Sequence, residues 1–458
     1  MTKNNNNPHY QHTTWSSSWT FILAATGAAV GLGNIWKFPY MAGDNGGAPF
    51  VLIYLAAILF IGIPLMIGEI LLGRLGRENP IDSMYKLAKL NNRSLNWKYT
   101  GWLGAFTLLL TFSFYSVIAG WAIAYFYKYF IYLFTHSSLN TVAEVKNEWS
   151  NFLSSPSQLL IWHSVFISIT VLVVIAGVIK GIERASNIMM PFLFIILFIL
   201  DIYALYYGDF NAGFKFLFQP NLSKINSTVI IDALGHAFFT LAIGAGCMLT
   251  YGAYLPKHTS IVKSVFIITI LDVMVAFLSG LAIFPIVFAN NLSPSSGPDL
   301  MFQVLPIAFI NMPYGNIIGC SFFMLLTFAA WTSSISFVEP LTMILTERTK
   351  LSRTASCVLI GIAAWTLGLF SLLSFNLWSD VLLFGRWTFF DVITDITTNL
   401  LLPIGGLLFA VFLGWKLNPK QAQEALLSQH DHHFKLWLFL IKYLVPLAIT
   451  IVLINSIV

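Results

Sequence analysis

Charged residues are scarce in this chain. Lysine, arginine, aspartate and glutamate make up 9% of its 458 residues, whereas hydrophobic residues make up 57% and the mean hydropathy is +0.77. Soluble domains carry roughly 25% charged residues, so the composition excludes one here. The three cysteines (Cys247, Cys320 and Cys357) all lie in apolar segments, and no disulfide framework is expected. The sequence also shows no nucleophile–base pair and no histidine or cysteine metal set, so we do not expect an enzyme.

What the chain does contain is a series of apolar runs, each long enough to cross a bilayer as a helix. Eleven segments are predicted, at 18–40, 48–73, 101–134, 158–179, 187–208, 229–255, 262–290, 315–346, 354–375, 388–414 and 435–457. The predicted fold class is therefore an all-α polytopic membrane protein. Residues 1–14, which are rich in Asn and His, are predicted to be a disordered tail without a cleavable signal peptide.

Basic residues are distributed unevenly between the two sets of loops. The tail and the loops on its side of the membrane carry 17 of the 24 lysines and arginines. The positive-inside rule then places the N-terminus in the cytoplasm and, after eleven crossings, the C-terminus outside. The net charge of +5 reflects this loop bias and predicts no nucleic-acid partner.

Two of the predicted segments are interrupted by glycines near their midpoints, in matching places in the two halves of the chain. The first contains Gly27, Gly31 and Gly33, and the second contains Gly244 and Gly246. Backbone groups freed by a break inside a bilayer must face a ligand or a cavity, and paired breaks of this kind indicate the binding site of a transporter. Taken alone, Gly27 and Gly31 would also suit close helix packing.

Several polar residues lie at the same depth as the breaks. Asp272 lies in the middle of segment 7, where an acid costs ~2.5–3.5 kcal/mol and needs a partner. A hard cation held with Asn34 and Thr240 is the favoured interpretation, and a protonated Asp272 is the alternative. The hydroxyl run that includes Thr332 and Ser333 predicts either a binding site or a helix kink in which the hydroxyls hydrogen-bond to the backbone of the preceding turn. Glu69 is interpreted as a brace for loosened backbone, and Asp201 has no assigned role.

These residues occur in order within specific motifs. The motifs are Gly-Leu-Gly-Asn-Ile-Trp-Lys-Phe-Pro-Tyr at 31–40, Asn-Gly-Gly at 45–47, Phe-Tyr at 114–115 with Trp121, Phe-Phe-Thr-Leu at 238–241 and Thr-Ser-Ser-Ile at 332–335. From about Trp15 to Trp415 the chain resembles the neurotransmitter:sodium symporters, in particular bacterial amino-acid transporters with the leucine-transporter fold. The resemblance implies a 5+5 inverted repeat with broken helices 1 and 6, formed by residues 15–208 and 229–414 and followed by a peripheral helix at 435–458 in the bacterial inner membrane.

The resemblance also implies two sodium sites and a substrate pocket. Sodium site one would consist of Ala29, Asn34, Thr240, Asp272 and the carboxylate of the substrate. Sodium site two would consist of Gly27, Val30, Ala329, Thr332 and Ser333. The substrate pocket would be formed by Ala29, Gly31, Gly33, Tyr115, Phe239, Thr240, Ala242, Ala245, Ser333 and Phe337.

Five positions refine this expectation. Amine-transporting relatives carry Asp where this chain has Gly31, so the substrate is expected to bring its own carboxylate. Small residues at Ala242 and Ala245 predict room for a large hydrophobic or aromatic neutral amino acid. Asp272, together with Ala276 at the position of the chloride-site serine, predicts no chloride requirement.

The gates depart from the pattern of the family. At the outer gate Lys37 replaces the usual Arg, and either Asp391 or Asp395 could be its partner. At the inner gate His12 replaces an Arg near Trp15, with Glu347 as its acid and Tyr254 as its aromatic neighbour. Because an imidazole loses its proton near ~6.5, we predict a pH-sensitive inner gate, with an idle tail histidine as the alternative.

The sequence thus predicts a symporter that imports a neutral amino acid with two Na⁺ and without chloride, in contact with membrane lipid. A proton-coupled transporter and a non-transporting amino-acid sensor of the same fold remain as alternatives. The sequence leaves the oligomeric state open, with a monomer among the options.

Overall fold

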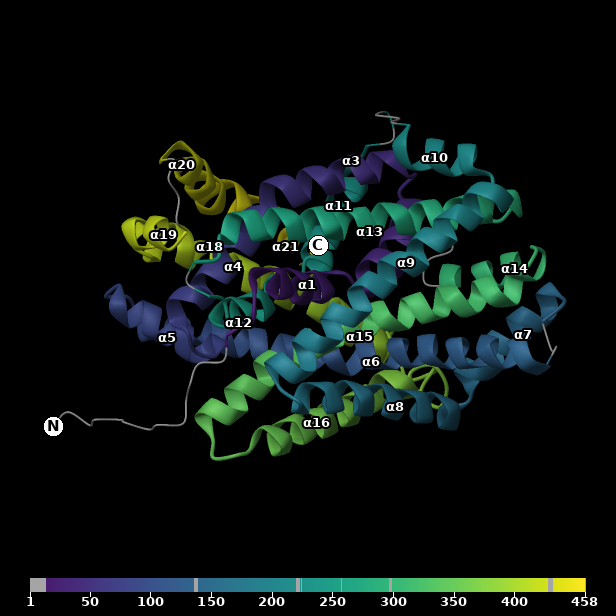
Figure 1. Cartoon of the computed structure of the whole chain (residues 1–458), viewed down its shortest axis with the longest axis horizontal. Coiled ribbons are helices and arrows are strands. Elements are labelled where there is room, and N and C mark those ends of the chain that lie inside the picture. The colour runs from purple at the N-terminus through teal and green to yellow at the C-terminus, as the bar shows by residue number, and fades with distance from the viewer. Residues whose placement is uncertain are drawn as a thin grey trace.

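The computed structural model describes residues 14–135, 139–219, 223, 225–256, 258–295, 299–426 and 431–457. Across these residues the chain is helical, and its β pairing is limited to one bridge between Leu383 and Trp387. The predicted all-α class is thereby confirmed, and the arrangement of the helices is shown in Figure 1.

The helices of the first half are α1 (Ser18–Ala29), η1 (Gly33–Lys37), α2 (Phe38–Asp44), α3 (Ala48–Ala57), η2 (Ile58–Gly62), α4 (Ile63–Gly76), α5 (Pro80–Leu90), η3 (Leu95–Trp97), α6 (Lys98–Thr135), α7 (Val142–Ser154), α8 (Pro156–Ile175), η4 (Val178–Glu183) and α9 (Arg184–Tyr207). Those that follow are α10 (Phe210–Phe218), α11 (Ser227–Thr240), α12 (Cys247–Ala253), α13 (Ile261–Ala289), η6 (Leu300–Val304), α14 (Leu305–Ile310), α15 (Gly315–Arg348), α16 (Arg353–Leu373), α17 (Phe389–Asp395), η7 (Ile396–Leu401), α18 (Leu402–Val411), η8 (Phe412–Lys416), α19 (Pro419–Ala425), α20 (Asp431–Phe439), η9 (Leu440–Leu444) and α21 (Val445–Ile457).

The membrane spans follow the predicted segments. Among the described residues, nine helices are long and apolar enough to cross a bilayer, and α1 with η1 and α2 forms a further span bent by 49°. The shorter helices α11 and α12 occupy predicted segment 6, on either side of residues 241–246. Each of the eleven predicted segments therefore corresponds to helical structure.

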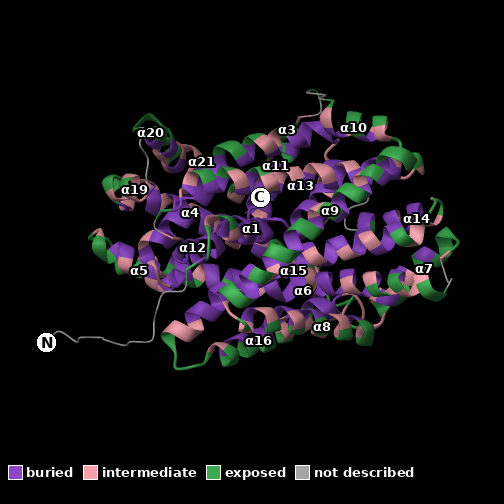
Figure 2. Ribbon diagram, in the orientation of Figure 1, coloured by how far each residue is buried: buried purple, intermediate pink, exposed green. Residues whose placement is uncertain are grey.

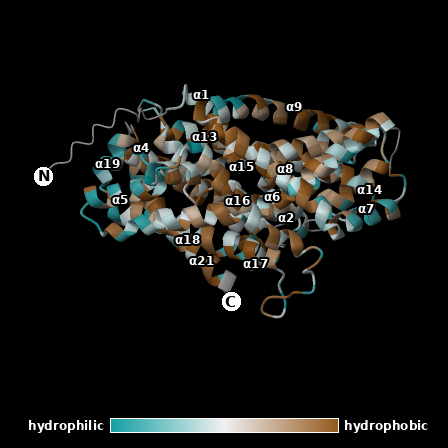
Figure 3. Ribbon diagram, turned by 90° about the horizontal axis from the view of Figure 1, so that it is seen from below, coloured by the Kyte–Doolittle hydropathy of each residue, from teal (hydrophilic) through white to brown (hydrophobic). Residues whose placement is uncertain are grey.

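Burial separates central helices from peripheral ones. The long helices α6 and α15 are apolar all round and pack along each other at the centre, as expected for helices enclosed by others. In α8, α9 and α16, one side is buried and the other exposes apolar side chains, as Figure 2 shows. Hydrophilic residues gather around α5 and α19 (Figure 3). We call this the inner end, following the predicted topology, and the opposite end with α7, α10 and α14 the outer end.

Both predicted breaks are present. Helix α1 ends at Ala29, Val30 is extended (φ −71°, ψ 107°), and helical structure resumes at Gly33. In the second break Ala242, Gly244 and Gly246 adopt φ values of 51°, 94° and 82°, which interrupt the helix between α11 and α12.

The second break is supported from two sides. A Cβ built on Gly244 would lie 2.3 Å from the Leu402 carbonyl oxygen, so α18 leaves room only for glycine. On the other side, the Gly244 N–H donates to the buried carboxylate of Glu69 at 2.5 Å. The interpretation of Glu69 as a brace for loosened backbone is confirmed.

Candidate functional site

The first polar cluster lies between the first break and α13. The Asn34 amide donates to Asp272 Oδ1 at 2.8 Å and to the Asp272 carbonyl at 3.0 Å, and the Thr240 hydroxyl lies 3.4 Å from both carboxylate oxygens. All three side chains are buried. The Asn34 Oδ1 accepts the Gly31 N–H and keeps a second lone pair for a ligand. The structure thus brings together the side chains predicted for sodium site one.

Tyr54 of α3 also belongs to this cluster, and the sequence analysis missed it. Its buried hydroxyl donates to Asp272 Oδ2 at 3.5 Å. A lone tyrosine in an apolar helix carries no signal that separates it from packing residues.

The second cluster joins the first break to α15. The Thr332 hydroxyl lies 3.0 Å from the Ala329 carbonyl and 3.5 Å from the Val30 carbonyl. The Ser333 hydroxyl lies 3.2 Å from the Val30 carbonyl and 3.3 Å from the Gly27 carbonyl. All five oxygens predicted for sodium site two therefore converge, and an oxygen-only ligand set suits a hard cation.

A small cavity, with a volume of about 30 Å³, lies beside both clusters. Nine of the ten predicted substrate residues line it. Its walls are formed by Ala28, Ala29, Gly31, Gly33, Leu108, Thr111, Tyr115, Phe239, Ala242, Ala245, Cys247, Ser333, Phe337 and Leu402. Thr240 is not among them, because its hydroxyl faces Asp272 instead. The sequence analysis missed the residues that reach the cavity only through packing, which are Ala28, Leu108, Thr111, Cys247 and Leu402.

The polar end of the cavity is built around Gly31. A Cβ at this position would lie 2.3 Å from the Ser333 hydroxyl oxygen and 2.8 Å from the Tyr115 hydroxyl oxygen, so a larger residue would have to displace both hydroxyls. The Tyr115 hydroxyl accepts the Leu32 N–H at 3.0 Å, which fixes the ring and leaves its own proton free to donate. The arrangement can receive an anionic group beside an apolar chamber.

Phe239 separates the cavity from a wide outer vestibule. Its ring lines both spaces, and the Lys37 ammonium lies over the ring at 4.6 Å from its centroid. The vestibule is also lined by Asp232, His236 and Asp395. Within the described part of the chain, Lys37 forms no ion pair with a carboxylate.

The structure distinguishes the two acids considered for the outer gate. Asp395 lines the vestibule near Lys37, whereas Asp391 caps the start of α17 by a reciprocal pair of bonds with Thr388 and does not line the vestibule. Asp232 of α11 is a further acid of this space that the sequence analysis did not identify. The Asn45 amide, from the Asn-Gly-Gly motif, holds its carboxylate at 3.1 Å.

The inner side is closed by aromatic packing around Trp15. The buried indole donates to the Tyr251 carbonyl at 3.0 Å and packs edge-on against Tyr254. The Tyr254 hydroxyl donates to Glu339 at 2.8 Å, and this buried carboxylate also pairs with Arg353. The acid that contacts the inner-gate aromatic is thus Glu339.

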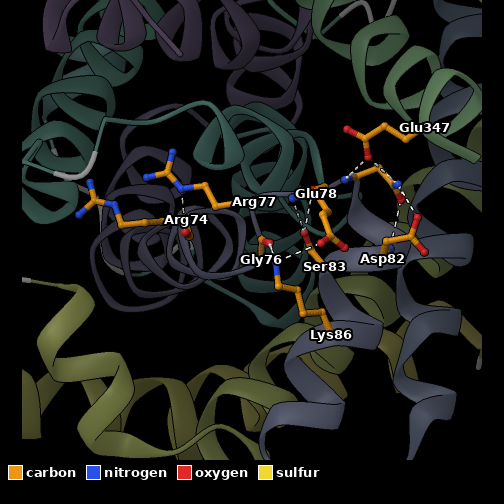
Figure 4. Close-up of polar contacts among 9 residues, drawn as sticks. Arg74, Gly76, Arg77, Glu78, Asp82, Ser83, Lys86 and Glu347 are labelled. Atoms are coloured by element: carbon orange, nitrogen blue, oxygen red, sulfur yellow. Dashed lines mark hydrogen bonds and ion pairs between the residues drawn. The ribbon is translucent and has the colours of Figure 1, made fainter. Parts of the chain in front are cut away.

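Glu347, the acid predicted to pair with His12 at the inner gate, contacts Asn79 among the described residues. Its carboxylate accepts the backbone N–H and the side-chain amide of Asn79 at 2.9 and 2.8 Å, at the start of α5. Figure 4 shows Glu347 and Asp82 on either side of this turn, with Lys86 reaching Gly76 and Glu78. His12 lies outside the described residues.

A third inner contact joins the start of α1 to η4. The N–H and the hydroxyl of Ser16 both donate to the buried carboxylate of Glu183, the N–H at 3.2 Å. Glu183 lies two residues after Gly181, in the π-helical turn that begins span 5. The sequence analysis did not identify this pair, because only the fold brings the start of α1 next to η4.

Comparison with known proteins agrees with this geometry. A family model described as the sodium:neurotransmitter symporter family matches residues 12–155 and 153–458. The chain belongs to the sodium:neurotransmitter symporter family. As a member it is a multi-pass, sodium-dependent membrane symporter and not an enzyme.

Relatives in this symporter family span the full chain. The uncharacterised sodium-dependent transporter YhdH of Bacillus subtilis is 39% identical over 453 residues, which cover 97% of each chain. An uncharacterised sodium-dependent transporter of Haemophilus influenzae is 33% identical over 463 residues, which cover 100% of each chain. A crystal structure of MhsT in complex with L-phenylalanine superposes with a TM-score of 0.89 at 37% identity, covering 97% of this chain and 99% of that one.

Proposed function

We propose that this symporter imports a large hydrophobic or aromatic L-amino acid together with two Na⁺. The observation that carries the proposal is the single cavity beside the two oxygen clusters, polar at Tyr115 and Gly31 and apolar elsewhere. A neutral amino acid has the same division into a polar end and an apolar end.

The polar end suits the α-carboxylate of the substrate. Tyr115 has a hydroxyl proton to donate, and the glycine at position 31 supplies no acid for a substrate amine. Placed there, the carboxylate would lie beside Asn34 and Thr240 and complete sodium site one. The substrate would then contribute a ligand to one of its own driving ions.

The apolar end suits a bulky side chain. Ala242 and Ala245 leave space that Leu108, Leu402 and Phe337 enclose, and the walls carry no charged side chain. The L-phenylalanine bound by MhsT, a relative of full length, supports the same substrate class.

Transport would proceed by alternating access. Sodium and substrate would enter through the vestibule, Phe239 would close over them, and the inner contacts around Trp15 would then open. One Na⁺ moving down −100 mV releases ~2.3 kcal/mol. A tenfold gradient adds ~1.4 kcal/mol per ion, so two ions could sustain a substrate gradient on the order of 10⁵-fold.

Chloride independence follows from the charge of site one. With sodium bound, Asp272 would supply a negative charge there, and the nearby Ala276 has no hydroxyl to hold an anion. The loop charges favour an orientation with the N-terminus in the cytoplasm, and the bacterial relatives support the inner membrane as the location.

The test is uptake by the purified full chain in proteoliposomes. A panel of labelled neutral amino acids would be supplied with an inward sodium or potassium gradient, in chloride or gluconate. We expect accumulation that requires sodium, does not require chloride and is lost in Asp272→Ala. Asp201→Asn is the matched control, because Asp201 is a membrane carboxyl of α9 that lies outside both clusters.

Two outcomes would contradict the proposal. Saturable sodium-dependent binding without accumulation would indicate a sensor. Uptake driven by a pH gradient alone would remove the two-sodium assignment.

A further inference from the structure

The segment that joins α16 to α17 forms a small hairpin at residues 381–387. Leu383 and Trp387 exchange backbone hydrogen bonds of 2.7 and 3.1 Å, and the chain reverses between them. Phe384 and Gly385 make the turn with φ values of 53° and 75°. We call this element the 381–387 hairpin.

The tip of the hairpin combines two unfavourable features in one residue. The Phe384 side chain is 81% exposed, the highest value among the exposed large hydrophobic side chains described, and its backbone adopts the left-handed conformation that residues with a side chain rarely adopt. Val381 and Leu382 beside it are exposed as well. Among the described residues the Phe384 ring contacts Trp387 edge-on, with 6.2 Å between the ring centroids, and this contact leaves most of the side chain exposed, which indicates a partner outside the chain.

The base of the hairpin fixes it to the lipid-facing side of α16. Phe370, Trp378 and Phe389 form a cluster with ring centroids 5.5–5.8 Å apart. Phe370 belongs to an exposed apolar stripe of α16 that also includes Leu359 and Ile362, and α16 spans the membrane. The hairpin therefore continues a surface that already faces lipid. Figure 3 shows the loop beside α17 projecting away from the body of the bundle.

The charge of the hairpin favours one partner. The Arg386 guanidinium lies over the Trp387 ring at 3.8 Å, so a cation and an amphipathic aromatic group occupy the same place. Aromatic rings of this kind concentrate at headgroup level, and arginine there reaches the lipid phosphates. We propose that the 381–387 hairpin is a membrane anchor, which inserts Phe384 below the headgroups of the outer leaflet and places Arg386 at their phosphates.

The anchor would act on the outer vestibule. Helix α17 begins two residues after the hairpin, and Phe390 and Asp395 on this helix line the vestibule. Holding the hairpin in the bilayer surface fixes the outer end of α17 while other walls of the vestibule move. This inference does not depend on which solute is carried.

The experiment places a fluorescent reporter at the tip of the full chain in phosphatidylcholine–phosphatidylglycerol liposomes. Phe384→Cys and Leu382→Cys are labelled separately with an environment-sensitive thiol dye, and Asp380→Cys, at an exposed polar position beside the hairpin, is the matched control. The three native cysteines are buried, and the unsubstituted protein labelled in parallel gives the background. Emission is then measured with nitroxide-bearing lipids and with aqueous iodide.

We expect dye at positions 384 and 382 to lose more than half of its emission to nitroxide lipids and to resist quenching by iodide. Dye at position 380 should instead be quenched by iodide and resist quenching by nitroxide lipids. Iodide quenching at position 384 equal to that at 380 would place the tip in water and overturn the proposal. Protection from both quenchers, with disulfide-linked dimers of Phe384→Cys, would overturn it in favour of a second copy of this chain.

Discussion

The cavity is closed very differently on its two sides. On the outer side the ring of Phe239 separates it from the vestibule, and over that ring lies Lys37, which forms no ion pair with the residues that the structure describes. On the inner side Trp15 is 2% exposed and is backed by Tyr254, Glu339 and Arg353. The outer closure is one side chain thick, whereas the inner closure combines aromatic packing with charged hydrogen bonds.

This difference identifies the conformational state of the transporter and shows which side opens more easily. A cavity covered by one ring and facing an open vestibule belongs to an outward-oriented, occluded state. Opening inward requires the loss of a buried charge network, whereas opening outward requires the movement of one ring. Sodium and substrate must therefore supply most of the free energy that opens the inner side.

The largest effect is expected from breaking the inner charge network. Glu339→Gln leaves the Arg353 guanidinium without its carboxylate, and losing one partner of a buried pair costs about 3–5 kcal/mol, with the lower value expected because Arg353 is partly exposed. The inner side should open, and hydrogen exchange should accelerate at residues 14–29 and 247–256.

Glu347→Gln is the matched control for this change. It alters the same kind of charge on the same helix, but its partner is Asn79 and not Tyr254. If the two variants accelerated exchange at Trp15 equally, the assignment of the inner closure to Glu339 would be wrong.

The next effect is expected from removing the outer lid. Phe239→Ala opens the cavity to the vestibule and should weaken substrate retention by about 2 kcal/mol, which corresponds to roughly 30-fold faster dissociation. The measurement is dissociation of labelled amino acid in saturating sodium, with Phe239→Leu as the control that keeps an apolar cover. Equal rates in wild type and Phe239→Ala would show that another group closes the cavity.

A smaller effect is expected at the contact between the start of α1 and η4. Ser16→Ala removes one donor to the Glu183 carboxylate, and a hydrogen bond to a charged group contributes about 1.5–3 kcal/mol when fully formed. Because Ser16 is exposed, the expected value lies near the lower end, and it should be visible as faster hydrogen exchange at residues 14–20.

A double-mutant cycle with Glu183→Gln checks the origin of that effect. Glu183→Gln weakens both contacts from Ser16, whereas Ser16→Ala removes the hydroxyl contact alone, so the double variant should resemble Glu183→Gln. Additive effects would show that Ser16 and Glu183 act independently.

The smallest effect is expected at Lys37. Lys37→Met keeps the apolar stem but removes the ammonium from the Phe239 ring, a contact of about 0.5–1 kcal/mol. Substrate should dissociate about 2–5-fold faster, as measured in the lid experiment, and Lys37→Arg should restore retention. A loss as large as that of Phe239→Ala would mean that the ammonium, and not the ring, holds the lid.

The sequence predicted the features that depend on local chemistry. Glycines at 244 and 246 predicted a break in a membrane span, and an acid at 272 predicted a polar or cationic partner for its carboxyl group within the membrane. The structure shows both breaks and places Asp272 with Asn34 and Thr240. These predictions required only that buried polar groups find partners.

The features that the sequence missed depend on packing between distant segments. Leu108 and Leu402 reach the cavity from α6 and α18, and nothing in their own surroundings distinguishes them from other membrane leucines. Glu347 and Glu339 lie two turns apart on α15, and the position of Asn79 decides which acid remains for Tyr254. In the same way, the cap at Thr388 engages Asp391, which leaves Asp395 as the proposed partner of Lys37.

The contact between the second break and α18 bears on how the substrate specificity of such a transporter can change during evolution. A Cβ on Gly405 would lie 1.9 Å from the Gly244 carbonyl oxygen, so the two backbones are locked together and their course cannot drift. Ala242 and Ala245, in the same loop, line the chamber, so a larger side chain at either position would shorten it without replacing Asp272 or Thr332. One or two substitutions would then suffice for a lineage to exchange one nutrient for another, while the residues of the two proposed sodium sites stay unchanged.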